Sequence, residues 1–290
     1  MTKIINSLSE ISDHYEALFV DLWGCVHDGV RAYEDANKAL TKYRSRGGKV
    51  ILVTNSPKTY AELEKQLIKF GVAEEAWDSI ASSGDSARVE MYKGIVGQKV
   101  YFIGEERDLT FFEPPDVLEK PLGIQRVPLE DAEGIVCTGP FDPKADPEIM
   151  RSQFFFAKER GLKLLCANPD IVVDRGNVRE WCAGALASIY KEIGGESLYF
   201  GKPHPPIYDL ALRRLAMLCA TIGKNKILAI GDGIQTDIQG AINQDIDSLF
   251  ITGGLAAQQT QTTDQPNKDA LKTYLEAENQ FPTLSIGFLR

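Results

Sequence analysis

Short apolar runs alternate along the chain with longer segments whose apolar residues recur at helical spacing. The first run begins at Ala17 and delivers Asp21, and Gly24 follows three residues later. Fully apolar runs that end in a turn signal are typical of central strands in a parallel sheet covered on both faces. The same pattern predicts further strands at or within residues 49–54, 78–84, 99–103, 134–137, 162–166, 197–200, 226–230 and 248–251.

Amphipathic segments lie between these strands, and several of them stop at glycine. The alternation predicts an α/β fold with a Rossmann-like, doubly wound parallel sheet. We expect a short amphipathic lead-in at residues 4–14 and an exposed, mobile, Gln- and Thr-rich linker at 257–267. The predicted helices are 33–46, 59–70, 85–93, 147–160, 181–193, 207–218, 238–242 and 269–278.

The strand and helix pattern restarts near residue 99 and runs for about a hundred residues before the first sheet resumes. A second α/β run inside the sequence of the first indicates an inserted domain. We therefore predict a core domain of residues 1–84 and 195–290 and an inserted α/β cap of residues 85–194. The aromatic run Phe154, Phe155 and Phe156 is expected to lie in the core of the cap.

The composition is that of an ordinary globular protein of 290 residues, with a net charge of −9. Nucleic-acid binding is not expected, because no run of Lys or Arg could neutralise a phosphate backbone. The five cysteines are scattered without CxxC spacing, which argues against a zinc site or a disulfide framework. No apolar run approaches the roughly 18 residues of a membrane helix. The sequence therefore predicts a reduced, cytoplasmic protein that does not enter a membrane.

Polar residues stand at the ends of four predicted strands, where a parallel sheet places its chemistry. Asp21 offers an oxygen nucleophile, and Asp232 can share a Mg²⁺ with it, because magnesium prefers one or two carboxylates. Thr54 offers a hydroxyl and strand-end amides to phosphate oxygens, and Lys202 offers a positive charge. Asp237 follows Asp232 in the same loop. Together these residue types meet the requirements of phosphoryl transfer.

Four motifs in this order resemble the haloacid dehalogenase superfamily of phosphotransferases. They are Phe-Val-Asp21-Leu-Trp-Gly, Val-Thr54-Asn55-Ser, Gly-Lys202-Pro-His-Pro and Gly-Asp232-Gly-Ile-Gln-Thr-Asp237-Ile. Within the superfamily the match is to the class IIA branch, which includes NagD and the 4-nitrophenyl phosphatases. The resemblance covers nearly the whole chain, and it implies a cap inserted between the second and third motifs.

The resemblance also implies roles for individual residues. Asp21 is expected to be the nucleophile, and Mg²⁺ is expected to be held by Asp21, Asp232 and the backbone carbonyl of Trp23. Asp237 is expected to bind the ion directly or through water. The turn Asn168-Pro169-Asp170 is similar to the turn that class IIA caps present to the active site. Asn55 and Lys202 complete the expected phosphate-binding set with Thr54.

One position departs from the family's pattern. The family carries a second aspartate two residues after the nucleophile, as the general acid and base, and this chain has Trp23 there. The indole N–H can only donate a hydrogen bond, so it cannot take that role. His27 or Asp28, in the following turn, is the substitute that the sequence offers. A milder departure is Asn243-Gln244-Asp245, where small residues are usual.

The predicted function is that of a Mg²⁺-dependent phosphomonoesterase acting on a small phosphorylated metabolite, with a low rate or a narrow range of leaving groups. The alternative is a regulatory module that binds phosphate esters through the same residues without turnover. A dehalogenase fits less well, because that chemistry does not need the Asp232 and Asp237 pair. The branch suggests a homodimer.

Overall fold

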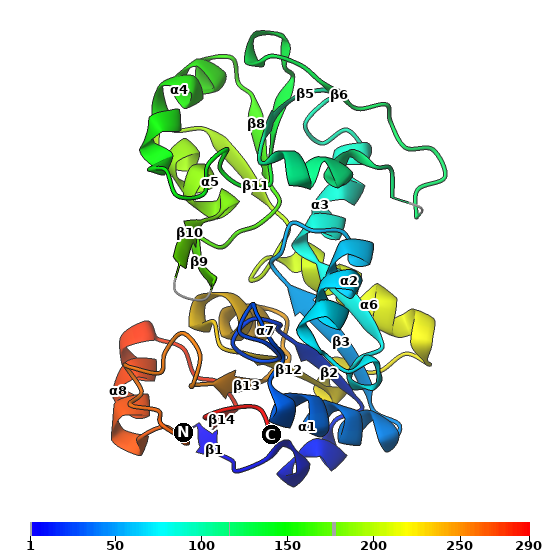
Figure 1. The fold of residues 1–290 in the computed structure, drawn as a ribbon, viewed down its shortest axis with the longest axis vertical. Helices are drawn as coiled ribbons and strands as arrows, with labels where there is room; N and C mark the ends of the chain where they lie inside the picture. The colour runs from blue at the N-terminus through cyan, green and yellow to red at the C-terminus, as the bar shows by residue number, and fades with distance from the viewer. Residues whose placement is uncertain (1, 116, 176–177) are drawn as a thin grey trace. The chain divides into compact units, whose positions relative to one another are not determined.

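The computed structural model describes residues 2–115, 117–175 and 178–290, which form two compact units (Figure 1). The domain borders predicted from the sequence remain a prediction, and each unit is described by itself. The first unit comprises Met1–Thr54, Leu63–Ala81 and Tyr208–Arg290, and the second comprises Asn55–Glu62 and Ser82–Ile207.

A seven-stranded sheet in the order β1-β14-β13-β12-β2-β3-β4 organises the first unit. Each recorded pairing in this sheet is parallel, and β2 lies between β12 and β3. The predicted α/β class with a Rossmann-like parallel sheet is therefore confirmed. The strands are β1 (Lys3–Ile4), β2 (Ala17–Val20), β3 (Lys49–Thr54), β4 (Ser79–Ser82), β12 (Ile227–Gly231), β13 (Asp247–Ile251) and β14 (Leu284–Ile286).

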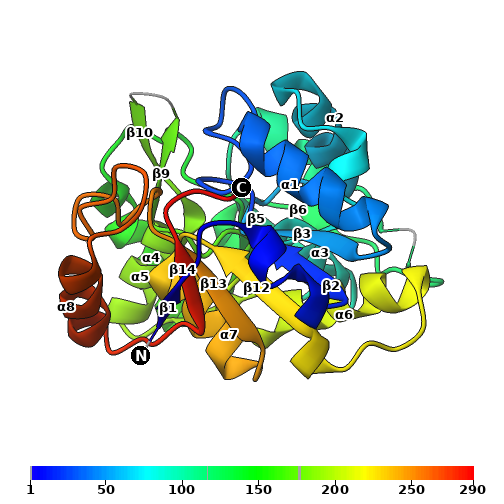
Figure 2. The ribbon, with the colours of Figure 1, turned by 90° about the horizontal axis from the view of Figure 1, so that it is seen from below.

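Helices lie on both faces of this sheet, with α1 and α2 opposite α6 and α7 (Figure 2). Acidic residues open α1 and basic residues close it, which suits the helix dipole, and its buried stripe is Ala36, Leu40 and Tyr43. The helices are α1 (Glu34–Ser45), α2 (Tyr60–Phe70), α6 (Pro205–Leu218), α7 (Gln239–Asn243) and α8 (Lys268–Glu278). Shorter turns are η1 (Leu8–Glu10), η2 (Ser12–His14), η3 (Glu74–Ala76), η7 (Lys224–Lys226) and the π-helical η8 (Ile234–Ile238).

Two segments of the first unit differ in part from what the sequence predicts. The lead-in helix expected at 4–14 is instead a two-residue strand followed by two 3₁₀ turns. The segment 257–267 forms turns in which most residues are exposed, as expected, but some of its polar side chains bond to the backbone of the unit. Thr260 is fully buried and donates to the carbonyl of Ala256, while Gln265 donates to the carbonyl of Ile5 and accepts from the amide of Gly287.

The second unit has its own five-stranded parallel sheet, in the order β11-β8-β7-β5-β6, and a separate antiparallel hairpin of β9 and β10. Its strands are β5 (Lys99–Ile103), β6 (Gln125–Arg126), β7 (Gly134–Cys137), β8 (Lys163–Cys166), β9 (Val172–Arg175), β10 (Val178–Trp181) and β11 (Glu196–Tyr199). Its helices are α3 (Ser83–Tyr92), α4 (Arg151–Glu159) and α5 (Ala183–Glu192), with the short turns η4 (Glu106–Phe112), η5 (Leu129–Asp131) and η6 (Pro147–Met150).

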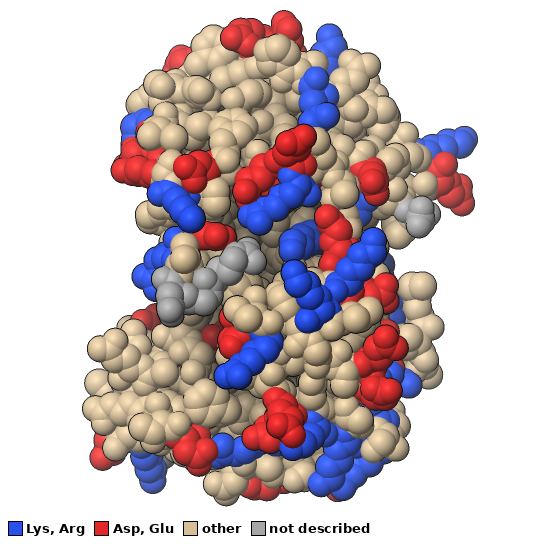
Figure 3. Space-filling view, in the orientation of Figure 1, with Lys and Arg blue, Asp and Glu red and all other residues tan. Residues whose placement is uncertain are grey.

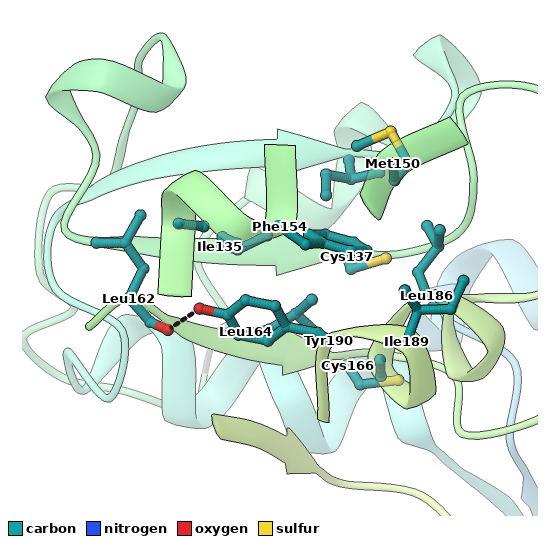
Figure 4. Close-up of a cluster of buried hydrophobic side chains, with 14 of the residues drawn as sticks. Ile135, Cys137, Met150, Phe154, Leu162, Leu164, Cys166, Leu186, Ile189 and Tyr190 are labelled. Carbon is teal, nitrogen blue, oxygen red and sulfur yellow. Dashed lines mark hydrogen bonds between the residues drawn. The ribbon is translucent and has the colours of Figure 1, made fainter. Parts of the chain in front are cut away.

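The core of the second unit forms where α4 and α5 pack on the sheet (Figure 4). Phe154 meets Tyr190 there, and the Tyr190 hydroxyl donates to the carbonyl of Leu162. Of the aromatic run expected in this core, only Phe154 is buried, while Phe155 and Phe156 are 48% and 45% exposed. Three consecutive residues cannot share one face of a helix, so the prediction for the last two was wrong.

The hairpin of the second unit was not predicted. Trp181, which was expected to open a helix, is the last residue of β10, and the helix begins at Ala183. The segment 172–180 contains several charged residues and lacks the apolar run by which the other strands were found.

Acidic and basic side chains are interspersed on the face of the molecule in Figure 3. Within the part of the chain that the structure describes, no helix is long and apolar enough to cross a bilayer.

The sheet of the first unit is tied to α1 by one shielded ion pair, which yields a stability prediction. Arg44 donates from Nε and from a terminal nitrogen to Asp78 at 2.9 and 2.6 Å, and Asp78 also accepts from the amide of Val50 at 2.8 Å. Asp78→Ala should lower the free energy of unfolding by about 2 kcal/mol in urea denaturation, because charged hydrogen bonds are lost at a shielded place.

Asp13→Ala is the matched control, because Asp13 pairs with Arg46 at 3.9 Å on the surface. That variant should change the free energy of unfolding by less than about 0.5 kcal/mol. Equal effects of the two variants would contradict the assignment.

Candidate functional site

Three candidate residues stand side by side at the carboxyl edge of the first unit's sheet. Asp232, Asp21 and Thr54 end or follow β12, β2 and β3, which are neighbours in that order. The register pairs Ile230 with Val20, and Val20 with Leu52. The three side chains come from residues that are 6%, 8% and 2% exposed. The parallel register therefore brings together groups that lie far apart in the sequence.

Tight backbone packing holds the Asp232 carboxylate in place. The amide of Leu255 donates to its Oδ2 at 3.0 Å. A methyl group on Gly24 or on Gly254 would collide with this carboxylate, and Gly24 also has a φ of +70°. Two loops, one after β2 and one after β13, thus approach Asp232 as closely as only glycine allows.

The carboxylates of Asp21 and Asp232 lie close to the thiol of Cys25. One ligand atom from each of these three buried residues lies within 4.8 Å of the other two. Two buried carboxylates this close repel each other unless a cation lies between them, so the donor set fits the divalent ion that the motifs imply. Sequence reasoning missed Cys25, although it stands only four residues after Asp21.

Asp237 lies outside this group. Its Oδ2 accepts from the amide of Gly233 at 3.1 Å and from the Thr236 hydroxyl at 3.4 Å, within its own loop. A methyl group on Gly231 would collide with the Asp237 carboxyl carbon, which shows how closely the side chain folds back onto the end of β12. Binding of the ion by Asp237, directly or through water, stays a prediction.

The Trp23 ring packs against the turn that follows it. It lies over Gly29, where a Cβ would collide with the indole, and it meets the His27 ring edge-on at 5.3 Å. His27 is fully buried, contacts Phe70 on another side, and accepts at Nδ1 from the amide of Gly29 at 3.0 Å. These contacts give His27 a structural role in this turn.

Asp28 is also a turn residue. Its Oδ1 accepts from the amides of Arg31 and Val30 at 2.8 and 2.9 Å. The hydrogen bond from the Arg31 amide is the main cause that lowers the pKa of Asp28; burial opposes it, and the Val30 amide and the Arg31 charge lower the pKa further. A lowered pKa disfavours the protonated form that a general acid needs near neutral pH.

The remaining candidates belong to the second unit and form a hydrogen-bonded set. Asn55 accepts from the amide of Lys202 at 2.7 Å and donates to the carbonyl of Lys202 at 3.2 Å. The side-chain nitrogen of Asn55 also donates to the carboxylate of Asp170 at 2.8 Å. Lys202 is 3% exposed and precedes a cis peptide bond to Pro203. Asn55 therefore fixes the backbone of the candidate lysine and one candidate carboxylate at once.

Asn168 and His204 have local structural roles. The side chain of Asn168 accepts from the amide of Asp170 at 3.0 Å, which makes an Asx turn. His204 stacks on Tyr199 with ring centroids 4.9 Å apart. Burial, with a smaller contribution from Lys191, lowers the pKa of His204. Its imidazole is thereby held towards the neutral form.

The sequence and the fold of this chain are similar to those of known proteins. A family model described as haloacid dehalogenase-like hydrolase matches residues 18–116, and a second, described as HAD-hydrolase-like, matches residues 199–277. A solved structure of a haloacid dehalogenase-like hydrolase from Brucella suis 1330 is 35% identical over 99% of this chain and 100% of its own, with a TM-score of 0.85. The chain belongs to the haloacid dehalogenase-like hydrolase family.

Other members of the family are more distant. An acid sugar phosphatase of Staphylococcus saprophyticus is 24% identical over 85% of this chain and 90% of its own. The p-nitrophenyl phosphatase of Archaeoglobus fulgidus is 19% identical, covers 94% of this chain and 96% of its own, and shares the fold with a TM-score of 0.71. The resemblance to the class IIA branch is confirmed, and the chain is a hydrolase of the phosphatase type.

The packing of Trp23 on Gly29 yields a prediction. Gly29→Ala should displace the indole ring and destabilise the protein by about 2 kcal/mol or more, because a collision adds to the cost of about 1 to 2 kcal/mol for a left-handed non-glycine residue. Near-ultraviolet circular dichroism and urea denaturation measure the two effects.

Gly47→Ala supplies the matched control. Gly47 has a φ of +97°, similar to the +84° of Gly29, but nothing lies within 4 Å of an added Cβ. It should show the backbone cost without a change in the tryptophan signal. An unaltered signal in Gly29→Ala would show that the ring does not rest on this turn.

Proposed function

We propose that the chain is a Mg²⁺-dependent phosphomonoesterase that acts on a small phosphorylated metabolite through an aspartyl phosphate on Asp21. The observation that carries the proposal is the buried pair of Asp21 and Asp232 beside Thr54 at the carboxyl edge of the sheet. A sugar phosphate or a nucleotide is the substrate class that we favour. The names of the relatives support phosphate esters, without identifying one for this chain.

The proposed cation ligands are Asp21, Asp232 and the backbone carbonyl of Trp23, with Asp237 acting through water. When bound, Mg²⁺ supplies positive charge that offsets the charges of the carboxylates and of the substrate phosphate. Asp232 presents its carboxylate in one orientation, because the Leu255 amide, Gly24 and Gly254 pack against it. Asp21 keeps the remaining task, which is to attack phosphorus.

In the first step, a carboxylate oxygen of Asp21 forms a bond to phosphorus as the bond to the leaving oxygen breaks. Thr54 donates to the phosphate oxygens, and Lys202 offsets their negative charge. In the second step, water attacks the aspartyl phosphate, which releases inorganic phosphate and restores the carboxylate. Asn55, Asn168 and Asp170 are the proposed substrate-binding residues, and Asn55 also holds the backbone of Lys202.

The missing general acid restricts this mechanism. Trp23 cannot protonate a leaving oxygen, and His27 and Asp28, the residues that the sequence offered in its place, make hydrogen bonds within their own turn. General acid–base catalysis is worth about 10² to 10⁴-fold in rate. We therefore propose that the enzyme favours leaving groups that depart as stable anions, such as a nitrophenolate. Water attack on the aspartyl phosphate should be slow for the same reason.

The second candidate function is a regulatory module that binds phosphate esters without turnover, and Trp23 is the observation that favours it. Saturable binding in calorimetry without phosphate release would distinguish it from the enzyme. A homodimer and a cytoplasmic location remain predictions from the sequence.

Asp21→Asn tests the proposed nucleophile. In assays with 4-nitrophenyl phosphate and Mg²⁺, this variant should lose all measurable hydrolysis, because an amide cannot form the acyl phosphate. Asp35→Asn, at an exposed position of α1, should keep the wild-type rate. Removal of Mg²⁺ with a chelator should have the same effect as the Asp21 substitution. Hydrolysis that survives in Asp21→Asn would refute the mechanism.

Trp23→Asp tests the acid–base deficit. The restored carboxylic acid should raise the rate on an alkyl ester such as glycerol phosphate at least about tenfold, which is a part of the roughly 10² to 10⁴-fold that this catalysis contributes. The rate on 4-nitrophenyl phosphate should rise less in the same assay. Trp23→Phe removes the indole without supplying an acid and should not raise either rate. Equal gains from both variants would mean that ring size limits turnover.

A further inference from the structure

Cys25 brings a sulfur donor to the two carboxylates of the proposed site. Cys25 is 1% exposed, and its Sγ lies within 4.8 Å of a carboxylate oxygen of Asp21 and of one of Asp232. Among the residues that the structure describes, these three form the only group of His, Cys, Asp and Glu that meets this spacing. The motifs implied the two carboxylates but not the thiol.

The spacing suits direct coordination. Zinc binds thiolate sulfur at about 2.3 Å and carboxylate oxygen at about 2.0 to 2.2 Å, so two of its ligands can lie roughly 4 Å apart or slightly more. Small rotations of the side chains would close the group around one ion. Magnesium takes oxygen ligands, whereas thiolate selects softer ions such as zinc. A set of one thiol and two carboxylates therefore favours zinc over magnesium.

We propose that Asp21, Cys25 and Asp232 bind a thiophilic divalent cation, zinc in the first place, in competition with Mg²⁺. As the ion binds, a metal–sulfur bond forms and the thiol proton leaves to solvent. Zinc prefers four ligands, so three protein donors leave a single open position, whereas Mg²⁺ keeps several positions for water and phosphate. Zinc binding thus inhibits the site. The inference rests on the proposed function, because two of its ligands are the proposed magnesium ligands.

The other cysteines offer a contrast. Cys137 and Cys166 are buried in the second unit. Cys182 is buried in the same unit, and Cys219, which directly follows α6, is partly exposed in the first unit. None of these four belongs to a metal-binding group by the spacing that selects Cys25.

Cadmium alone is the probe for the test, because cadmium–thiolate bonds absorb in the ultraviolet. Titration of the full chain with Cd²⁺ should produce a charge-transfer band that saturates at one equivalent. Zn²⁺ should remove the band at comparable concentration, and Mg²⁺ only in large excess. Asp232→Asn should weaken Cd²⁺ binding at least about tenfold, since even outer partners of a metal are worth about 10 to 100-fold.

Cys25→Ser should abolish the band, and Cys219→Ser, the matched control, should retain it. Cys25→Val, which replaces the buried thiol with an apolar group, is the second variant, and circular dichroism verifies the fold of each. The proposal is overturned if wild type gives no band, if the band survives in folded Cys25 variants, or if it disappears in Cys219→Ser. The wild-type titration alone decides the first of these outcomes.

The test separates this inference from the proposed function. Hydrolysis of 4-nitrophenyl phosphate that depends on Asp21, combined with no cadmium band, would overturn only the role of Cys25. A band that depends on Cys25, combined with no phosphate release from any ester, would overturn only the enzyme.

Discussion

Repulsion between two buried carboxylates is the constraint on which the site depends. The parallel register of β12 and β2 places Asp232 beside Asp21, and both residues are almost excluded from water. Like charges in such a place are stable only when a cation or a proton offsets them. The sheet therefore creates a need for positive charge at its carboxyl edge, and the chemistry of the site follows from how that need is met.

The turn after β2 meets a different requirement. Its backbone brings Gly24 against Asp232 and places the Trp23 ring on Gly29, with His27 enclosed beneath. The position that carries an acid in related enzymes here contributes to packing instead. The residue at position 23 can either stabilise the turn by packing or protonate a leaving group. In this chain Trp23 packs on the turn. Under the proposed mechanism, the rate therefore depends on how readily the substrate's own leaving group departs.

The sequence was a good guide wherever apolar runs marked buried strands. Those runs ended at Asp21, Thr54 and the loop of Asp232, and the rule for parallel sheets placed their ends together. It was a poor guide where polar side chains made structure, as in the segment of Thr260 and Gln265, whose bonds to distant backbone no local pattern reveals. Cys25 was missed because spacing rules for metal sites look for cysteine or histidine partners, whereas its neighbours are aspartates that follow two different strands.

The enclosure of Asp232 has a consequence for how this residue can be probed. Its carboxylate is the point on which the segments after β2, β12 and β13 converge, through the Leu255 amide and the contacts with Gly24 and Gly254. Alanine in place of Asp232 would leave a cavity and would remove the hydrogen-bond acceptor of the Leu255 amide, so the three segments could rearrange together. Loss of activity in such a variant would report on loop architecture as much as on chemistry. Asparagine, which keeps the shape and removes only the charge, separates the two.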